Sequence, residues 1–117
     1  DVRMRMERKL QQNFEQVEWL AFIGHTHRPG VITADRQFLL PEQDDWTYHA
    51  EQGRKAIVNV GSVGQPRDGD PRPTFVTVDG EQVRFHRVDY DVERTARKVE
   101  ESGILDPQMA DRLRNGT

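Results

Sequence analysis

Apolar residues recur at two different spacings along the chain, and the change in spacing separates predicted helices from predicted strands. Between residues 3 and 17 they return every three or four positions, which predicts an amphipathic helix with a basic and polar outer face. Six shorter apolar runs are separated by polar or turn-forming residues, and they predict strands. These runs are 19–23, 31–33, 38–40, 56–60, 74–78 and 82–88.

The residues between the runs indicate how some of them pair. The polar turn Ala34–Gln37 predicts a hairpin between the second and third runs. Asp79-Gly80 predicts a tight hairpin between the last two, because Gly takes positive φ freely. The runs 19–23 and 56–60 are continuously apolar, so we expect both strands to be buried on both faces. Residues 41–55 are polar, and we expect them to be irregular.

Two short helices are predicted at the end of the chain. Asp91 is a suitable N-cap for the first, and Gly103 suits the position that follows its last turn. Asp106-Pro107 begins the second, and Gly116 ends it. Helices and strands together predict an α/β or α+β fold.

The composition is that of a soluble chain with little material for a core, since apolar residues make up 34% and charged residues 32%. A length of 117 residues suits one small domain or part of a larger one. Cysteine is absent, which excludes disulfides and thiolate metal sites and fits the cytoplasm. A net charge of −3, with both signs mixed, argues against a nucleic-acid scaffold. No apolar run approaches the ~20 residues that a membrane span needs.

The stretch "FIGHTHRPG", residues 22–30, contains two of the 4 histidines of the chain, His25 and His27. In an extended segment, side chains two residues apart project to the same side, so the pair can bind one metal together or one each of two neighbouring metals. The alternative is that the spacing of the two histidines is a coincidence and that they bind no metal, because a short motif of this kind also arises by chance. It follows a predicted strand that ends at Gly24, at the strand edge where α/β sheets place chemistry.

Two stretches together resemble a known family. "GHTH" after one buried strand, and "VNVGSVGQPRDGDPR" after another, resemble the calcineurin-like metallophosphoesterases. The resemblance is closest to the bacterial branch of diadenosine tetraphosphatase-like or phosphodiesterase-like enzymes, and "RVDYDVERTARKV" is similar to that branch too. It covers the chain from about Val17 to its end.

This resemblance implies a two-sheet β-sandwich flanked by helices, with a two-metal site at the strand ends. His25 and His27 would each bind one of two divalent ions, for which we expect manganese, with iron, nickel and zinc as alternatives. The implied reaction is hydrolysis of a phosphomonoester or phosphodiester, to which both metals contribute. Its implied substrates are small phosphoesters or nucleotides, with phosphoproteins as a further class.

The chain departs from the family pattern in one large respect. The family motifs D-x-H, G-D-x-x-D and G-N-H are absent, and in family members they precede GHTH. The chain also begins Asp-Val-Arg-Met rather than with an initiator Met. We therefore expect residues 1–117 to be the C-terminal part of a single metallophosphoesterase domain, without a catalytic residue of its own. Alone it should be inactive, and it should pair with the missing N-terminal half or self-associate.

The sequence is also compatible with two other functions. The first is a non-catalytic binding or regulatory module that keeps the fold without a complete site. The second is a small metal-binding domain that uses the two histidines alone, which is disfavoured because zinc prefers four ligands.

Gly24, Asn59, Gly61, Ser62 and Arg67 are expected to line the substrate pocket that the resemblance implies. For Asn59, Gly61 and Ser62 the alternative is a Gly-rich turn after a strand. Arg67 and Arg72 could each clamp a phosphate or form ion pairs with the acidic residues between them. His49 and His86 are expected to be structural or surface residues.

Overall fold

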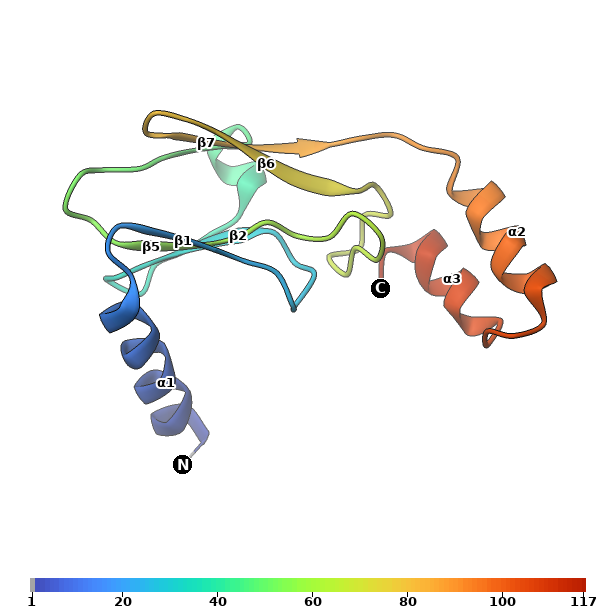
Figure 1. Ribbon diagram of the computed structural model, residues 1–117, viewed down its shortest axis with the longest axis horizontal. Helices are drawn as coiled ribbons and strands as arrows, with labels where there is room; N and C mark the ends of the chain where they lie inside the picture. Colours follow the sequence, from blue (N-terminus) through green and yellow to red (C-terminus); the bar gives the residue numbers. More distant parts are fainter. Residues whose placement is uncertain (1) are drawn as a thin grey trace.

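The computed structural model describes residues 2–117, which form three α-helices, seven strands and one short 3-10 helix (Figure 1). The elements are α1 Val2–Gln16, β1 Leu20–Ile23, β2 Gly30–Thr33, β3 Phe38–Leu39, η1 Pro41–Asp44, β4 Thr47–His49, β5 Ala56–Asn59, β6 Thr74–Asp79, β7 Gln82–Arg87, α2 Val92–Ser102 and α3 Gln108–Asn115. The strands form two sheets, in the orders β1-β5-β2-β3 and β4-β7-β6. The predicted fold class, a mixed fold of two sheets flanked by helices, is confirmed.

The direction of the strands brings three chain segments to one end of the larger sheet. β1 and β5 are parallel, whereas β2 is antiparallel to β5, with Gly30 opposite Asn59. The carboxyl ends of β1 and β5 therefore lie beside the start of β2. The loop that carries the histidine pair begins and ends at this end of the sheet.

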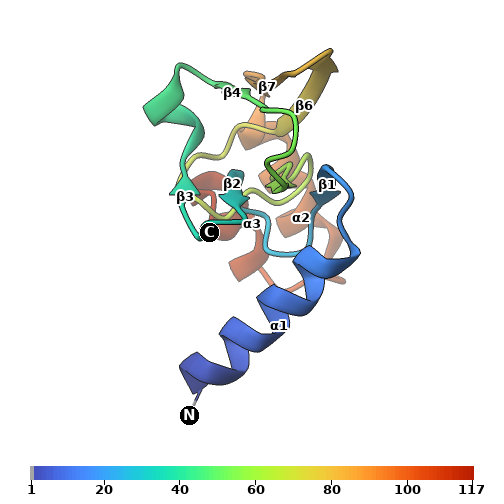
Figure 2. The same ribbon diagram turned by 90° about the vertical axis from the view of Figure 1, so that its left-hand side faces the viewer.

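The core lies between the two sheets, which form separate layers in both views (Figures 1 and 2). Alternate residues of β5 face opposite sides, since Ala56 and Val58 join the core between the sheets while Ile57 packs with Phe14 and Val17 near α1. The full set of buried residues between the sheets is Val31, Tyr48, Ala50, Ala56, Val58, Val83 and Phe85. The prediction that 56–60 is a strand buried on both faces is confirmed for β5.

The same prediction for 19–23 is wrong. β1 is an outer strand that pairs with β5 alone, and Phe22 and Ile23 are each 44% exposed. A continuous apolar run marks a strand that is suited to burial, but it does not say whether neighbours lie beside it. Within residues 2–117, the outer edge of β1 has no paired strand.

Both predicted hairpins form, with small differences from the sequence prediction. Val31 pairs with Leu39 in the first, and Asp79 pairs with Gln82 in the second, so its two-residue loop is Gly80-Glu81. Residues 41–55 are less irregular than expected, because they contain η1 and β4. Three residues of β4 pair with the distant strand β7, which no local pattern indicates.

The three predicted helices also form, and two of them make an arm beside the sheets (Figure 1). Asp91 caps α2 by accepting a hydrogen bond from the Arg94 N–H at 3.0 Å, and α2 ends at Gly103. α1 extends away from the sheets on the other side (Figures 1 and 2). Of the helices described, none has the length and apolar character to cross a membrane.

Candidate metal-binding site

Two loops meet at the end of the larger sheet, residues 24–29 after β1 and residues 60–73 after β5. Asn59 joins them, since its side-chain amide donates to the main-chain oxygen of Gly24 at 2.9 Å and to the Thr26 hydroxyl at 2.7 Å. Farther along, the Arg67 N–H donates to the His27 oxygen at 3.1 Å. The predicted neighbourhood of the histidine loop and the Asn59–Ser62 segment is confirmed.

His27 is held by its ring. Its Nδ1 lies 2.7 Å from the main-chain oxygen of Gln65. A carbonyl oxygen only accepts, so Nδ1 carries the proton and the neutral ring keeps a lone pair on Nε2. Gln65 is in turn fixed by Ser62, whose hydroxyl accepts from the Gln65 N–H at 2.9 Å. A histidine that binds a metal through one nitrogen commonly donates the other N–H to such a carbonyl.

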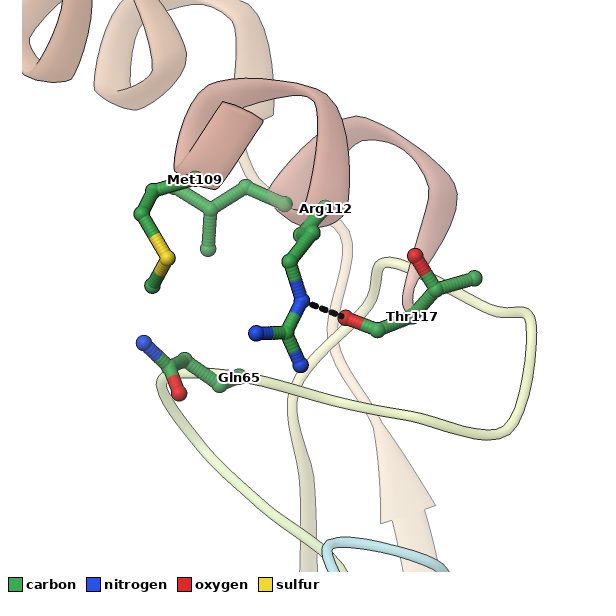
Figure 3. Close-up of a pocket in the computed structure, with 5 residues that line it drawn as sticks. Gln65, Met109, Arg112 and Thr117 are labelled. Atoms are coloured by element: carbon green, nitrogen blue, oxygen red, sulfur yellow. Dashed lines mark hydrogen bonds between the residues drawn. The ribbon is translucent and has the colours of Figure 1, made fainter. Parts of the chain in front are cut away.

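α3 and the residues after it contact the loop of residues 60–73 as well. Gln65 lies across a small hollow from Met109 and Arg112, and the Arg112 side chain donates to the Thr117 main-chain oxygen at 3.1 Å (Figure 3). The Gly69 N–H donates to the oxygen of Gly116 at 2.9 Å. The helical arm therefore helps to fix the loop that holds His27.

The backbone at the two histidines differs from the extended segment that the sequence argument assumed. His25 has φ of 69° and His27 φ of 60°, so both lie in the left-handed region. The Thr26 N–H donates to the Gly24 oxygen at 2.9 Å, which closes a three-residue turn around His25. The expectation that strand alternation places both rings on one side is therefore wrong. Strained residues of this kind gather at functional sites.

The two glycines assigned to the pocket differ in their surroundings. A Cβ built on Gly24 would meet no heavy atom within 4 Å, and Gly24 has no positive φ. Gly61 has φ of 80°, and a Cβ there would lie 2.8 Å from Thr74 Cβ and 3.3 Å from Pro29 Cβ. Gly61 is therefore required where the second loop passes the start of β6.

Arg67 and Arg72 differ in whether they form an ion pair with a neighbouring carboxylate. Arg72 forms a 2.6 Å ion pair with Asp70, and its hydrogen bonds hold the pKa of Asp70 below the usual value. Arg67 has no ion pair among residues 2–117, its Nη2 lies 3.5 Å from the Gln65 side-chain oxygen, and its buried Nε has no partner there. The Arg67 guanidinium therefore still has an N–H donor without a partner, whereas the Arg72 guanidinium is paired with Asp70.

The sequence argument missed Arg87, whose side chain is only 4% exposed. Its guanidinium binds the Asp68 carboxylate and donates to the Arg72 oxygen at 2.8 Å, which ties the second loop to β7. Burial lowers the pKa of Arg87. A charged residue in a strand carries no local signal of such a role.

The other two histidines lie on the smaller sheet. His86 stacks on Phe75 with ring centroids 4.8 Å apart, and its Nε2 is 2.8 Å from the Thr77 hydroxyl. His49 is exposed on β4. Both belong to strands of the other sheet, and the printed partners of the His86 ring, Phe75 and Thr77, lie on β6, which fits the structural or surface role expected for the two residues.

The donor set of the described residues suits a divalent metal but does not enclose one. Nowhere in residues 2–117 do three or more His, Cys, Asp or Glu side chains gather closely enough to hold an ion. The free Nε2 of His27 fits a borderline divalent metal, since imidazole suits manganese, iron, nickel and zinc. Two imidazoles do not complete a coordination sphere, and no further His, Cys, Asp or Glu side chain of residues 2–117 joins them in a cluster that could hold an ion.

A solved structure shares this architecture. The metallophosphoesterase from Sphaerobacter thermophilus superposes with a TM-score of 0.78 and 32% sequence identity, over 94% of this chain and 48% of that one. The chain has a metallophosphoesterase fold. A metal-dependent phosphoester hydrolase is the class of protein that this fold supports. An uncharacterized protein of Methanocaldococcus jannaschii is 33% identical over 82 residues, which are 68% of this chain and 32% of that protein.

No protein-family model matches the chain. The chain spans about half the length of the solved metallophosphoesterase and about a third of the curated relative.

Proposed function

We propose that this chain supplies His25 and His27 to a dinuclear metal centre that hydrolyses phosphomonoesters or phosphodiesters, with one imidazole to each ion. The observation that carries the proposal is the hydrogen bond between His27 Nδ1 and the Gln65 oxygen, 2.7 Å long. It leaves Nε2 as the ligand atom of the neutral ring. The contact lies at the strand ends of a metallophosphoesterase fold.

The residues around the histidines have separate tasks in this proposal. Asn59 fixes the turn at His25 through Gly24 and Thr26. Ser62 fixes Gln65, and Arg67, whose Nε has no hydrogen-bond partner within residues 2–117, offers its guanidinium to a phosphate oxygen. When bound, two divalent ions supply charge neutralisation at the phosphoryl group and activation of water. Manganese is the metal proposed, with iron, nickel or zinc as alternatives.

The remaining ligands are proposed to come from an N-terminal part of the same domain, of which residues 1–117 form the C-terminal part. Support comes from the share of the solved metallophosphoesterase that this chain covers, 48%. It also comes from the outer edge of β1, where Phe22 and Ile23 are each 44% exposed. A neighbouring strand would cover both side chains and pair the free edge. In this proposal the protein acts in the cytoplasm on small phosphoesters or nucleotides, or on phosphoproteins.

The test is hydrolysis by the native protein in which this chain occurs. It is assayed on p-nitrophenyl phosphate and bis-p-nitrophenyl phosphate with Mn²⁺, Fe²⁺, Ni²⁺ or Zn²⁺. We expect metal-dependent turnover that falls by about 100-fold in His27→Ala. The matched control His86→Ala changes a histidine of the other sheet and should keep full turnover. Turnover that is unchanged in His27→Ala contradicts the proposal, and a folded protein without any turnover favours a binding or regulatory module.

A further inference from the structure

Two glycines follow the last turns of α2 and α3 in the same backbone conformation but in different surroundings. Gly103 follows α2 with φ of 62°, and Gly116 follows α3 with φ of 63°. A Cβ built on Gly103 would meet no heavy atom within 4 Å. A Cβ built on Gly116 would lie 2.6 Å from the main-chain carbon and oxygen of Asp70 and 2.7 Å from its nitrogen. Only glycine therefore lets the end of α3 approach the loop of residues 60–73 this closely.

Hydrogen bonds on both main-chain groups of Gly116 hold it at this contact. Its N–H donates to the Arg112 oxygen, which closes the last turn of α3. Its oxygen accepts from the Gly69 N–H at 2.9 Å. The same residue therefore ends the helix and binds the loop.

The loop cannot shift at this contact without disturbing its ion pairs. The Asp70 carboxylate pairs with Arg72 at 2.6 Å and lies 3.7 Å from the Nε of Arg87. The Arg87 side chain is only 4% exposed and also binds Asp68. A displacement of the Asp70 main chain would change the geometry of all three contacts, so the distance between α3 and the loop is fixed from both elements.

α3 also borders Gln65, whose main-chain oxygen lies 2.7 Å from the Nδ1 of His27. The hollow between them measures about 10 Å³, about the least space that one water molecule needs. A gap this small means that a displacement of α3 reaches Gln65. The hollow is lined by Gln65, Met109, Arg112, Leu113 and Thr117 (Figure 3).

We infer that Gly116 is a positioning residue of the candidate metal-binding site. Its contact with Asp70 sets the distance between α3 and the loop, and this distance keeps the Gln65 oxygen at the Nδ1 of His27. A side chain at position 116 forces either the loop or α3 to move, and Gln65 belongs to the one and borders the other. With the proton kept on Nδ1, Nε2 is the ring atom available to a metal. The inference rests on the proposed function and gives the two C-terminal helices a part in it.

The experiment compares Gly116→Ala with the matched control Gly103→Ala in the native protein. Both variants place alanine at a positive φ, but only the first brings its methyl group against another segment. The readout is the ring of His27 in nitrogen-15 NMR of the metal-free protein at about pH 8.5, where an ordinary imidazole is neutral. Wild type and Gly103→Ala should carry the hydrogen on Nδ1, and Gly116→Ala should show a share of the ring with the hydrogen on Nε2. A wild-type His27 signal in folded Gly116→Ala, or the same change in both variants, overturns the inference.

A second pair of variants decides the question if Gly116→Ala does not fold. Met109→Ala removes a side chain of α3 beside Gln65 and adds no clash, and its control is Met4→Ala on α1, where Met4 is 67% exposed. Met109→Ala should also admit the form of the His27 ring with the hydrogen on Nε2, and Met4→Ala should not. An unchanged His27 signal in Met109→Ala would show that α3 does not position Gln65, which overturns the inference.

Metal affinity separates this inference from the proposed function. Mn²⁺ is titrated into the native protein and the two glycine variants by calorimetry. The affinity for one of the two ions should fall about tenfold in Gly116→Ala, as for the loss of a partner that orients a ligand, and stay unchanged in Gly103→Ala. If wild type binds no Mn²⁺, the proposed function fails and the NMR measurement still decides the role of Gly116. Wild-type affinity for both ions in Gly116→Ala overturns the inference alone.

Discussion

His27 Nδ1 lies 2.7 Å from the Gln65 main-chain oxygen, and this contact joins the loop after β1 to the loop after β5. It determines which ring nitrogen carries the proton, and so which one is left to bind a metal. Because the Gln65 N–H is itself bonded to the Ser62 hydroxyl, the acceptor is fixed before any ligand arrives. The Asn59–Ser62 segment thus contacts the histidine loop through Gln65, a residue that the sequence analysis did not single out.

The first prediction concerns this proton. In nitrogen-15 NMR at about pH 8.5, where an ordinary imidazole is neutral, the His27 ring should carry its hydrogen on Nδ1 and show an unprotonated Nε2. His49 is the internal comparison, since its ring has no hydrogen bond within residues 2–117. A His27 signal with the hydrogen on Nε2 would remove the observation on which the proposed ligand role depends.

The second prediction concerns the hairpin between β6 and β7. Gly80 has φ of 57°, and a Cβ there would meet no heavy atom within 4 Å, so any effect of a side chain acts through the backbone. Gly80→Val should lower the free energy of unfolding by about 1 kcal/mol or more, because a β-branched residue resists positive φ. Denaturant unfolding measures it, with Gly64→Val as the control. Gly64 has open space and no positive φ, so equal effects of the two variants would mean that φ is not the cause.

The hairpins and helices were predictable because their signals are local. Asp79-Gly80 lies between two β-rich runs, and Asp91 and Gly103 bound the helix between them. The location of GHTH at the end of a strand was also predictable, because the continuous apolar run 19–23 ends directly before it. These features need only a few consecutive residues to be decided.

Features that depend on distant partners were not predictable in this way. The apolar run of β1 predicts a buried strand. Whether its side chains are exposed depends on which segment pairs with the outer edge of the strand, and the run itself does not show this. β4 has three residues and forms against β7, more than thirty residues away. Arg87 is buried because it meets Asp68 in a loop that the sequence does not place. The left-handed backbone of His25 and His27 occurs in a loop that forms hydrogen bonds with Asn59 and Gln65, which are more than thirty residues away along the chain.

The third prediction concerns pH. Hydrogen bonds from Arg72 hold the folded-state pKa of Asp70 below its ordinary value, so folding favours the ionised carboxylate. This contribution is complete above the unfolded-state pKa of about 3.9 and is lost as pH falls through the lower folded-state pKa. Asp70→Asn should therefore lower the free energy of unfolding near neutral pH, by less than about 1 kcal/mol because the pair is partly exposed.

The difference between wild type and Asp70→Asn should shrink as the pH is lowered below about 4. Urea unfolding at a series of pH values measures it. Asp44→Asn is the control, since Asp44 is exposed and has no ion pair in the described part of the chain. A difference that stays constant down to the acid limit would show that the charge of Asp70 is not what stabilises the loop.

The fourth prediction concerns residues 1–117 produced alone. They should bind divalent metal weakly and show no turnover of p-nitrophenyl phosphate, because two histidines offer only one ligand to each ion. They should also self-associate in gel filtration, because Phe22 and Ile23 are exposed along a free strand edge. Addition of the N-terminal part of the native protein should restore a defined complex and turnover. A monomeric chain that turns over substrate with metal would contradict this prediction.

The metal content of the native protein tests the central claim most directly. The protein is saturated with Mn²⁺, freed of unbound metal by gel filtration and measured by atomic emission. The account predicts about two ions per wild-type protein, about one in His25→Ala, about one in His27→Ala, and two in the control His86→Ala. Two ions retained in both His25→Ala and His27→Ala would contradict it.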